Sequence, residues 1–143
     1  MAALALAAAL PAAAAEPPGP RQAPRIAVEQ AWIRAQPDTG EMTAGYLTMV
    51  NSGDAPAVVV GVECRGIGMT RLHESVERQG MIRMVARDSL VVPPRGRLEL
   101  RPRGLHLMLM RLARPLAGGE RVGCRLRLRG GVTVPYEAEV RAP

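Results

Sequence analysis

The chain has 143 residues, of which 48% are hydrophobic, and this size and composition are typical of one folded globular domain. Only Trp32, Tyr46 and Tyr136 are aromatic, so the stacking platforms that single-stranded nucleic acids require are nearly absent. The net charge of +6 comes from arginine without any lysine, and it indicates either solvated strand faces or a patch that steers the protein towards an acidic partner.

The first segment of the chain has the features of an export signal. Residues 1–15 form a short apolar run that ends in alanines, which fits a small-residue cleavage site and is too short to span a bilayer. The usual positively charged start is missing, so an upstream start of translation and a disordered alanine-rich tail both stay open. Residues 16–25 are rich in proline and predict a linker. We therefore expect a periplasmic protein, in a compartment where disulfides persist.

The chain beyond residue 25 predicts β-strands. Short runs rich in Val, Leu, Ile and Thr alternate with turns of Gly, Pro, Asn and Asp, and no segment keeps a helical period for long. The expected strands are 26–34, 44–51, 57–64, 69–77, 81–86, 97–101, 105–112, 121–129 and 133–141. This spacing predicts a single all-β domain over residues 26–143, an antiparallel sandwich or barrel.

The two cysteines both lie on apolar strand faces. Cys64 shares its face with Val62, and Cys124 shares its face with Leu126, so alternation predicts that both point into the core. A buried disulfide and two buried free thiols are both compatible with that placement. A redox or metal role is disfavoured, because the two cysteines are far apart in the sequence and form no C-x-x-C motif.

The segment 105–110 reads L-H-L-M-L-M and is unusual for a strand. Alternation places the three leucines on one face and His106, Met108 and Met110 on the other. If the leucines face the core, the His/Met face is exposed or half-exposed. Exposed methionine invites oxidation outside the cytoplasm, so such a row indicates a function. Thioethers select Cu(I) and imidazole also suits copper, whereas zinc more often takes Cys, His or carboxylate ligands.

The second histidine, His73, precedes another pair of methionines. Leu72 is expected to face inward and His73 outward. After a turn at residues 79–80, Met81 and Met84 lie on opposite faces of a regular strand, so alternation alone does not decide between them. Considered singly, each residue has an ordinary explanation as a solvated histidine or as a core methionine.

The spacing of these residues carries more information than any of them alone. His73, Met84, His106 and Met108 follow the pattern H-x10-M-x21-H-x-M, which resembles the signature of the periplasmic copper chaperones called PCu(A)C. Further segments are similar to that family: A-W-I-R-A at 31–35, G-Y-L-T-M-V-N-S-G-D at 45–54, L-H-E at 72–74, G-M-I-R-M at 80–84, H-L-M-L-M at 106–110 and R-P-L at 114–116.

This resemblance implies a cupredoxin-like Greek-key β-sandwich or barrel. It implies one Cu(I) ion, bound by His73, Met84, His106 and Met108. It also implies delivery to the apo copper-centre domain of cytochrome c oxidase, directly or through a Sco-type thiol protein. We expect a monomer with no membrane span and no nucleic-acid partner. Some members bind further copper through a His/Met-rich C-terminal extension, and we do not expect that second store here.

Other functions fit the residues less well. A blue-copper electron carrier needs a Cys thiolate near a His, and no His follows Cys124. A hydrolase needs a base paired with a nucleophile, or a metal with an open position. The sequence indicates neither arrangement, so we do not expect an enzyme. A copper-sequestering or resistance protein would use the same residues without a transfer partner, and it is the main alternative. A purely structural or interaction module is a further one.

Overall fold

The chain folds into β-strands joined by turns, as the sequence predicts. The structure is a computed structural model that describes residues 24–39 and 41–142. Its strands are β1 (Ile26–Arg34), β2 (Thr43–Asn51), β3 (Ala57–Cys64), β4 (Ile67–Arg78), β5 (Met81–Arg87), β6 (Leu90–Val92), β7 (Gly96–Glu99), β8 (Leu105–Leu112), β9 (Arg121–Leu128) and β10 (Thr133–Arg141). The short strand β6 was missed by the sequence prediction. The predicted export signal lies outside the described residues.

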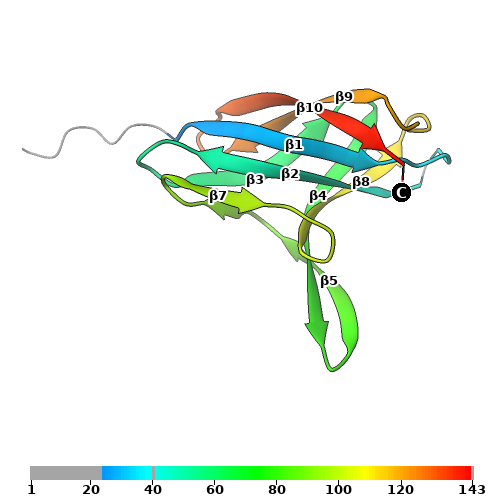
Figure 1. The fold of residues 1–143 in the computed structure, drawn as a ribbon, viewed down its shortest axis with the longest axis horizontal. Helices are drawn as coiled ribbons and strands as arrows, with labels where there is room; N and C mark the ends of the chain where they lie inside the picture. The colour runs from blue at the N-terminus through cyan, green and yellow to red at the C-terminus, as the bar shows by residue number, and fades with distance from the viewer. Residues whose placement is uncertain (1–23, 40, 143) are drawn as a thin grey trace, which may run out of the picture.

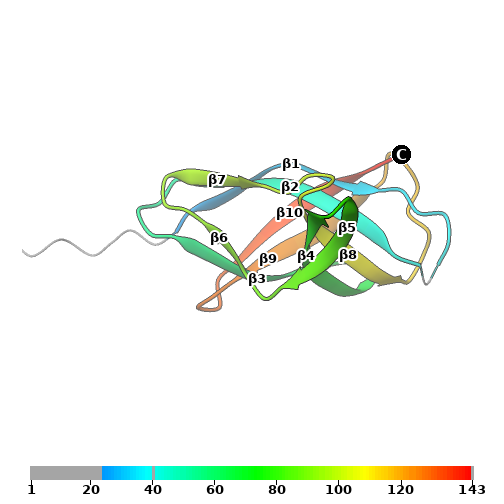
Figure 2. The same cartoon turned by 90° about the horizontal axis from the view of Figure 1, so that it is seen from below.

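All ten strands belong to one sheet that folds over on itself. Along the sheet the order is β5-β4-β8-β2-β1-β10-β9-β3-β6, and β7 pairs with β2. β1 and β10 are parallel, and the other pairs are antiparallel. β3 also contacts β4, and β6 contacts β7, so the sheet closes into a sandwich around one core (Figure 2). Within the described residues, no helix is long and apolar enough to cross a membrane.

The core is built by regular alternation along the strands. In β9, the residues Val122, Cys124, Leu126 and Leu128 are buried while their neighbours in sequence are exposed. Such alternation fixes the register, because a slip by one residue would bring arginines into the core. The predicted inward orientation of this strand is therefore confirmed.

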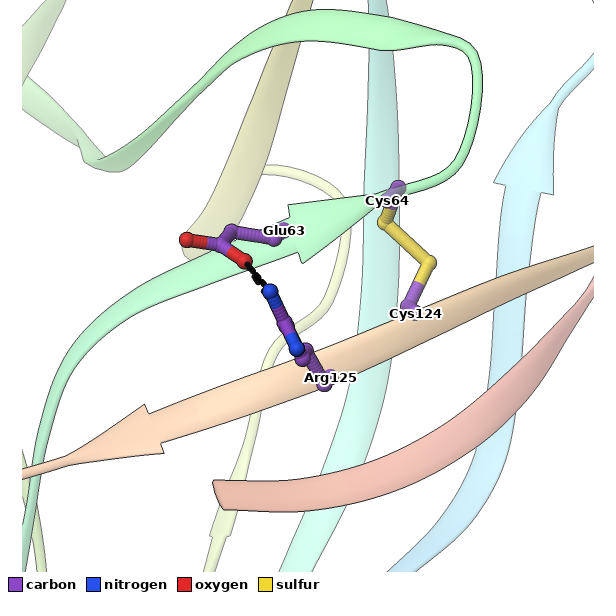
Figure 3. Close-up of a disulfide and its surroundings, with 4 residues drawn as sticks. All are labelled: Glu63, Cys64, Cys124 and Arg125. Carbon is purple, nitrogen blue, oxygen red and sulfur yellow. Dashed lines mark hydrogen bonds and ion pairs between the residues drawn. A yellow bond between two sulfur atoms is a disulfide. The ribbon is translucent and has the colours of Figure 1, made fainter. Parts of the chain in front are cut away.

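A disulfide joins β3 to β9. Cys64 and Cys124 are direct partners in the strand register, their Cα atoms are 4.1 Å apart, and their sulfurs are bonded (Figure 3). Beside them Arg125 Nε donates a hydrogen bond of 2.7 Å to Glu63 Oε2. Of the two possibilities that the sequence left open, the structure contains the disulfide.

The strands β4 and β5 form a hairpin that projects from the sandwich (Figure 1). β4 pairs with β8 only as far as Glu74, whereas its pairing with β5 continues to Arg78. The turn consists of Gln79 and Gly80, with φ angles of 52° and 74°. Positive φ at both positions is typical of the two-residue turns that match the twist of a hairpin. The outer part of the hairpin is thus a two-stranded ribbon.

Candidate metal centre

The two histidines of the chain meet on neighbouring strands. His73 on β4 and His106 on β8 are direct partners in the antiparallel register. Their ring centroids are 5.8 Å apart and the rings are nearly perpendicular, at 80°. Directly opposite residues point to the same face of a sheet, so both imidazoles project from one surface.

Met108 lies on the same surface as the histidines. It follows His106 by two residues on β8, and its register partners are Arg71 on β4 and Ala44 on β2. Residues two apart in a strand share a face, so the predicted grouping of His106 with Met108 is confirmed. Met110 shares this face too, but it lies further along β8, opposite Met69.

The register of β5 distinguishes Met84 from Met81. Met84 is the partner of Ser75, which lies two residues after His73 and therefore on the histidine face. Met81 is the partner of Arg78, on the opposite face of the hairpin. Of the two methionines that alternation could not separate, only Met84 stands with the histidines.

A cleft of about 320 Å³ brings three of the four predicted ligands together. Met84, His106 and Met108 line it, and the remaining wall consists of Arg34, Ala35, Gln36, Met42, Thr43, Ala44, Tyr46, Ser75 and Arg103. His73 does not line this cleft, and its place in the site comes from its pairing with His106. The four predicted residues therefore form one cluster, with His73 at its edge.

The His/Met face is more buried than the sequence predicts. His106 is 3% exposed and Met108 is 9% exposed, so the expectation of an exposed or half-exposed face was wrong for these two residues. The physical reason lies in the neighbouring segments, since Ala44 of β2 is the direct partner of Met108 and residues 34–36 and 42–44 form the wall of the same cleft. His73 is half-buried, and Met84 on the hairpin is 58% exposed. The site thus has a buried floor and an open side.

The ring nitrogens of the histidines are arranged for coordination. Gly104 O lies 3.0 Å from His106 Nδ1, and since a carbonyl oxygen only accepts, Nδ1 carries the proton. This leaves the lone pair on Nε2, which is buried without a hydrogen-bond partner, as is His73 Nδ1. A buried polar atom without a partner costs free energy, and a metal ion bound between the two rings, whose centroids are 5.8 Å apart, would give these nitrogens a partner.

The surroundings of His73 favour its neutral imidazole form. Burial lowers the pKa of His73 below its usual value of 6.5, and the nearby His106 and Arg71 lower it further. Neutral imidazole is the form that binds metal. None of the residues that line the cleft is acidic, and the described residues hold no group of three His, Cys, Asp or Glu side chains suited to a metal. Two imidazoles and two thioethers suit Cu(I) better than a hard divalent cation.

Met42 is a thioether of the cleft that sequence reasoning missed. It is 55% exposed and lies just before β2. Its carbonyl oxygen accepts a hydrogen bond of 3.0 Å from Gln36 Nε2, and this bond links the segment just before β2 to the segment that follows β1. No periodicity or spacing in the sequence signals this residue, because it reaches the cleft from a connecting segment.

A larger hollow of about 680 Å³ lies at the disulfide, away from the histidines. Charged side chains line much of it, among them Glu63, Arg65 and Arg125. None of its lining residues is a histidine or methionine. Its two cysteines are bonded to each other and supply no thiolate, so the hollow does not compete with the His/Met cluster as a copper site.

The chain is similar in sequence to known proteins. Residues 26–140 match the model of a family described as "Putative lipoprotein LpqE-like". The chain is 35% identical to Lxx21020 of Leifsonia xyli subsp. xyli, which is named as a lipoprotein, over 130 residues that cover 90% of this chain and 76% of the relative.

Two solved structures share the fold. The copper-bound PCuAC domain from PmoF2 matches with a TM-score of 0.68 and 26% identity, over 86% of this chain and 98% of that domain. The structure of CuI-DR1885 from Deinococcus radiodurans matches with a TM-score of 0.61 and 33% identity, over 80% of this chain and 76% of that protein. The predicted cupredoxin-like β-sandwich is thereby confirmed.

Proposed function

This chain belongs to the LpqE-like family and has the fold of PCuAC domains, and from this premise we propose that it is a metallochaperone that binds one Cu(I) ion and delivers it to another protein. Two similar solved structures support copper as the cargo, since one is a copper-bound PCuAC domain and the other a Cu(I) form. A carrier that binds and releases an ion needs no catalytic group, so the proposal does not make this protein an enzyme.

His73, Met84, His106 and Met108 are the proposed ligands. The observation that carries this assignment is the direct pairing of His73 with His106, with an orphaned nitrogen on each ring and thioethers on the same face. His106 and Met108 form the buried floor, where the hydrogen bond to Gly104 holds the imidazole in one orientation. His73 and Met84 close the coordination sphere from the hairpin side.

The ligand set also suits release of the ion. All four donors are uncharged, and the two cysteines are bonded to each other and supply no thiolate. The 58% exposure of Met84 gives an incoming protein access to the ion from the hairpin side. The partner's ligands would then replace Met84 first and the buried ligands last, through an intermediate in which both proteins share the ion.

The recipient belongs to the proposal as well. We propose the apo copper-centre domain of cytochrome c oxidase or a Sco-type thiol protein, reached in the periplasm. Export is supported by the relative that is named as a lipoprotein and by the disulfide, which persists in oxidising compartments. The residue pattern that resembles PCu(A)C proteins supports the recipient.

The deciding experiment compares two routes of copper loss. Protein loaded with Cu(I) is mixed with the apo copper-centre domain. The change in absorption of that domain then monitors its metallation. The rate is compared with spontaneous release into a Cu(I) chelator. A chaperone transfers faster to the protein than it releases the ion by itself. Transfer that never exceeds spontaneous release would favour the alternative, a copper-sequestering protein without a partner.

A further inference from the structure

The β4–β5 hairpin exposes large apolar side chains on both of its faces. Every residue of β5 is exposed, and Met81, Ile82, Met84 and Val85 are between 44% and 65% exposed. Alternation places Met81 and Val85 on one face, and Ile82 and Met84 on the other. We call residues 75–87 the arm.

The position of the arm leaves these side chains uncovered. β5 is the end strand of the sheet, and beyond Glu74 the arm consists of two strands only (Figures 1 and 2). A two-stranded hairpin is marginally stable in water by itself, and exposed apolar clusters and unpaired strand edges are typical of binding surfaces. The arm therefore has the properties of a surface that a partner covers.

The arm is continuous with the proposed copper site. Met84 and its partner Ser75 both belong to the arm and both line the cleft of the His/Met cluster. A protein that takes the ion from this open side must come within contact of Met84. Its surface would then meet Ile82, two residues away on the same face.

The charges around the arm indicate the kind of partner. Arg34 and Arg103 are exposed and line the cleft on the Met84 side, whereas Arg78 and Arg83 lie on the opposite face of the arm. Glu74 is already paired with Arg87, and Glu77, the remaining acidic residue of this hairpin, stands opposite Ile82, so the arginines outnumber the free carboxylates around the arm. A second copy of a chain with a net charge of +6 would bring like charges together. Carboxylates on a different protein would complement the arginines.

We propose that the arm is the docking element for the protein that receives copper, and that it binds an apolar patch bordered by carboxylates on that protein. This inference rests on the proposed function and specifies which surface the transfer partner recognises. Apolar contacts of the arm hold the complex, and the arginines raise the rate of encounter. Both effects act on transfer between proteins and leave the binding of copper itself unchanged.

The test uses the full chain with the double substitution Ile82→Ser/Val85→Ser. We expect unchanged Cu(I) affinity and unchanged extraction by a small chelator, with transfer to the apo copper-centre domain slowed about tenfold or more. Val132→Ser is the matched control, because Val132 is 56% exposed and lies in the turn between β9 and β10. Near-ultraviolet circular dichroism checks that each variant is folded.

A charge reversal provides a second, independent measurement. Arg83→Glu is expected to slow transfer at low ionic strength, and the difference from wild type should shrink at high salt, because salt screens exposed charges. Wild-type transfer rates in both the double variant and Arg83→Glu would overturn the docking role of the arm. Sedimentation that shows a wild-type dimer dissociated by Ile82→Ser would assign the arm to a second copy instead. If wild type itself transfers no faster than it releases copper to a chelator, the proposed function fails first.

Discussion

His73 and His106 are direct partners across the β4–β8 strand pair, and their ring centroids are 5.8 Å apart. This pairing depends on a single register between two strands that are distant in the sequence. A slip by one residue would turn His73 to the opposite face, where Leu72 now packs in the core. The same register that buries Leu72 against Leu107 therefore assembles the histidine pair.

Exchange of Met84 for leucine is expected to weaken Cu(I) binding by about tenfold or more, since it removes a soft ligand. The fold should remain intact, because Met84 is 58% exposed and leucine has a similar volume. Competition titration with a Cu(I) chelator measures the effect. Met81→Leu is the matched control, since Met81 is 60% exposed on the other face of the hairpin. An equal loss in both variants would contradict the assignment.

Exchange of Met108 for leucine is expected to reduce copper affinity while costing under about 1.5 kcal/mol of folding free energy, as is usual for hydrophobic substitutions of similar volume. Met108 is 9% exposed, so urea denaturation of the apo protein checks that the packing survives. Met110→Leu is the control, because Met110 shares the face but does not line the cleft. If Met110→Leu loses as much affinity as Met108→Leu, the predicted spacing selects the wrong residue.

The pH dependence of copper binding follows from the lowered pKa of His73. Burial and the charges of His106 and Arg71 keep this ring neutral below its usual pKa of 6.5. Protons therefore compete with copper at His73 only when the pH falls through this lowered pKa. We expect its contribution to Cu(I) affinity to be constant above pH 6.5 and to be lost in more acidic solution. Titrations from pH 7.5 down to the pH at which the apo protein unfolds test this, and an affinity that stays flat over that whole range would mean that His73 is not a ligand.

Arg71→Gln should move this loss of affinity to higher pH, because it removes one of the positive charges that lower the pKa of His73. The lowered pKa of His73 also makes the stability of the apo protein depend on pH. As the pH decreases below 6.5, the unfolded chain takes up a proton at His73 before the folded chain does. The free energy of unfolding therefore decreases with decreasing pH until the pH is below the pKa of His73 in the folded protein. Equal pH profiles for wild type and Arg71→Gln would show that Arg71 does not influence this ring.

The disulfide is expected to stabilise the fold without contributing to the copper site. The double substitution Cys64→Ala/Cys124→Ala should lower the free energy of unfolding by about 2–5 kcal/mol, as is typical when a native disulfide is removed. Copper affinity should remain unchanged in the folded variant, because neither cysteine lines the cleft of the histidines. Denaturation and Cu(I) titration of the same sample separate the two effects. A parallel loss of affinity would show that β3 and β9 position the site.

The sequence by itself determined the class of fold and predicted the residues of the proposed site. Alternation of apolar residues in β9 predicts its buried face, because side chains of a strand point to opposite sides in turn. The same rule places His106 and Met108 together on β8. The spacing that resembles copper chaperones selects His73 and Met84 as well, before any three-dimensional information is available.

The tertiary structure alone decided how these residues meet. Local alternation cannot choose between Met81 and Met84, because the choice depends on which of them stands beside Ser75 in the register. The burial of His106 depends on the wall formed by residues 34–36 and 42–44, and Met42 enters the cleft from that wall. Periodicity is a property of one strand, whereas the register between strands and the burial of a face arise from long-range packing. This packing determines the positions of the histidine pair, the cleft and the disulfide.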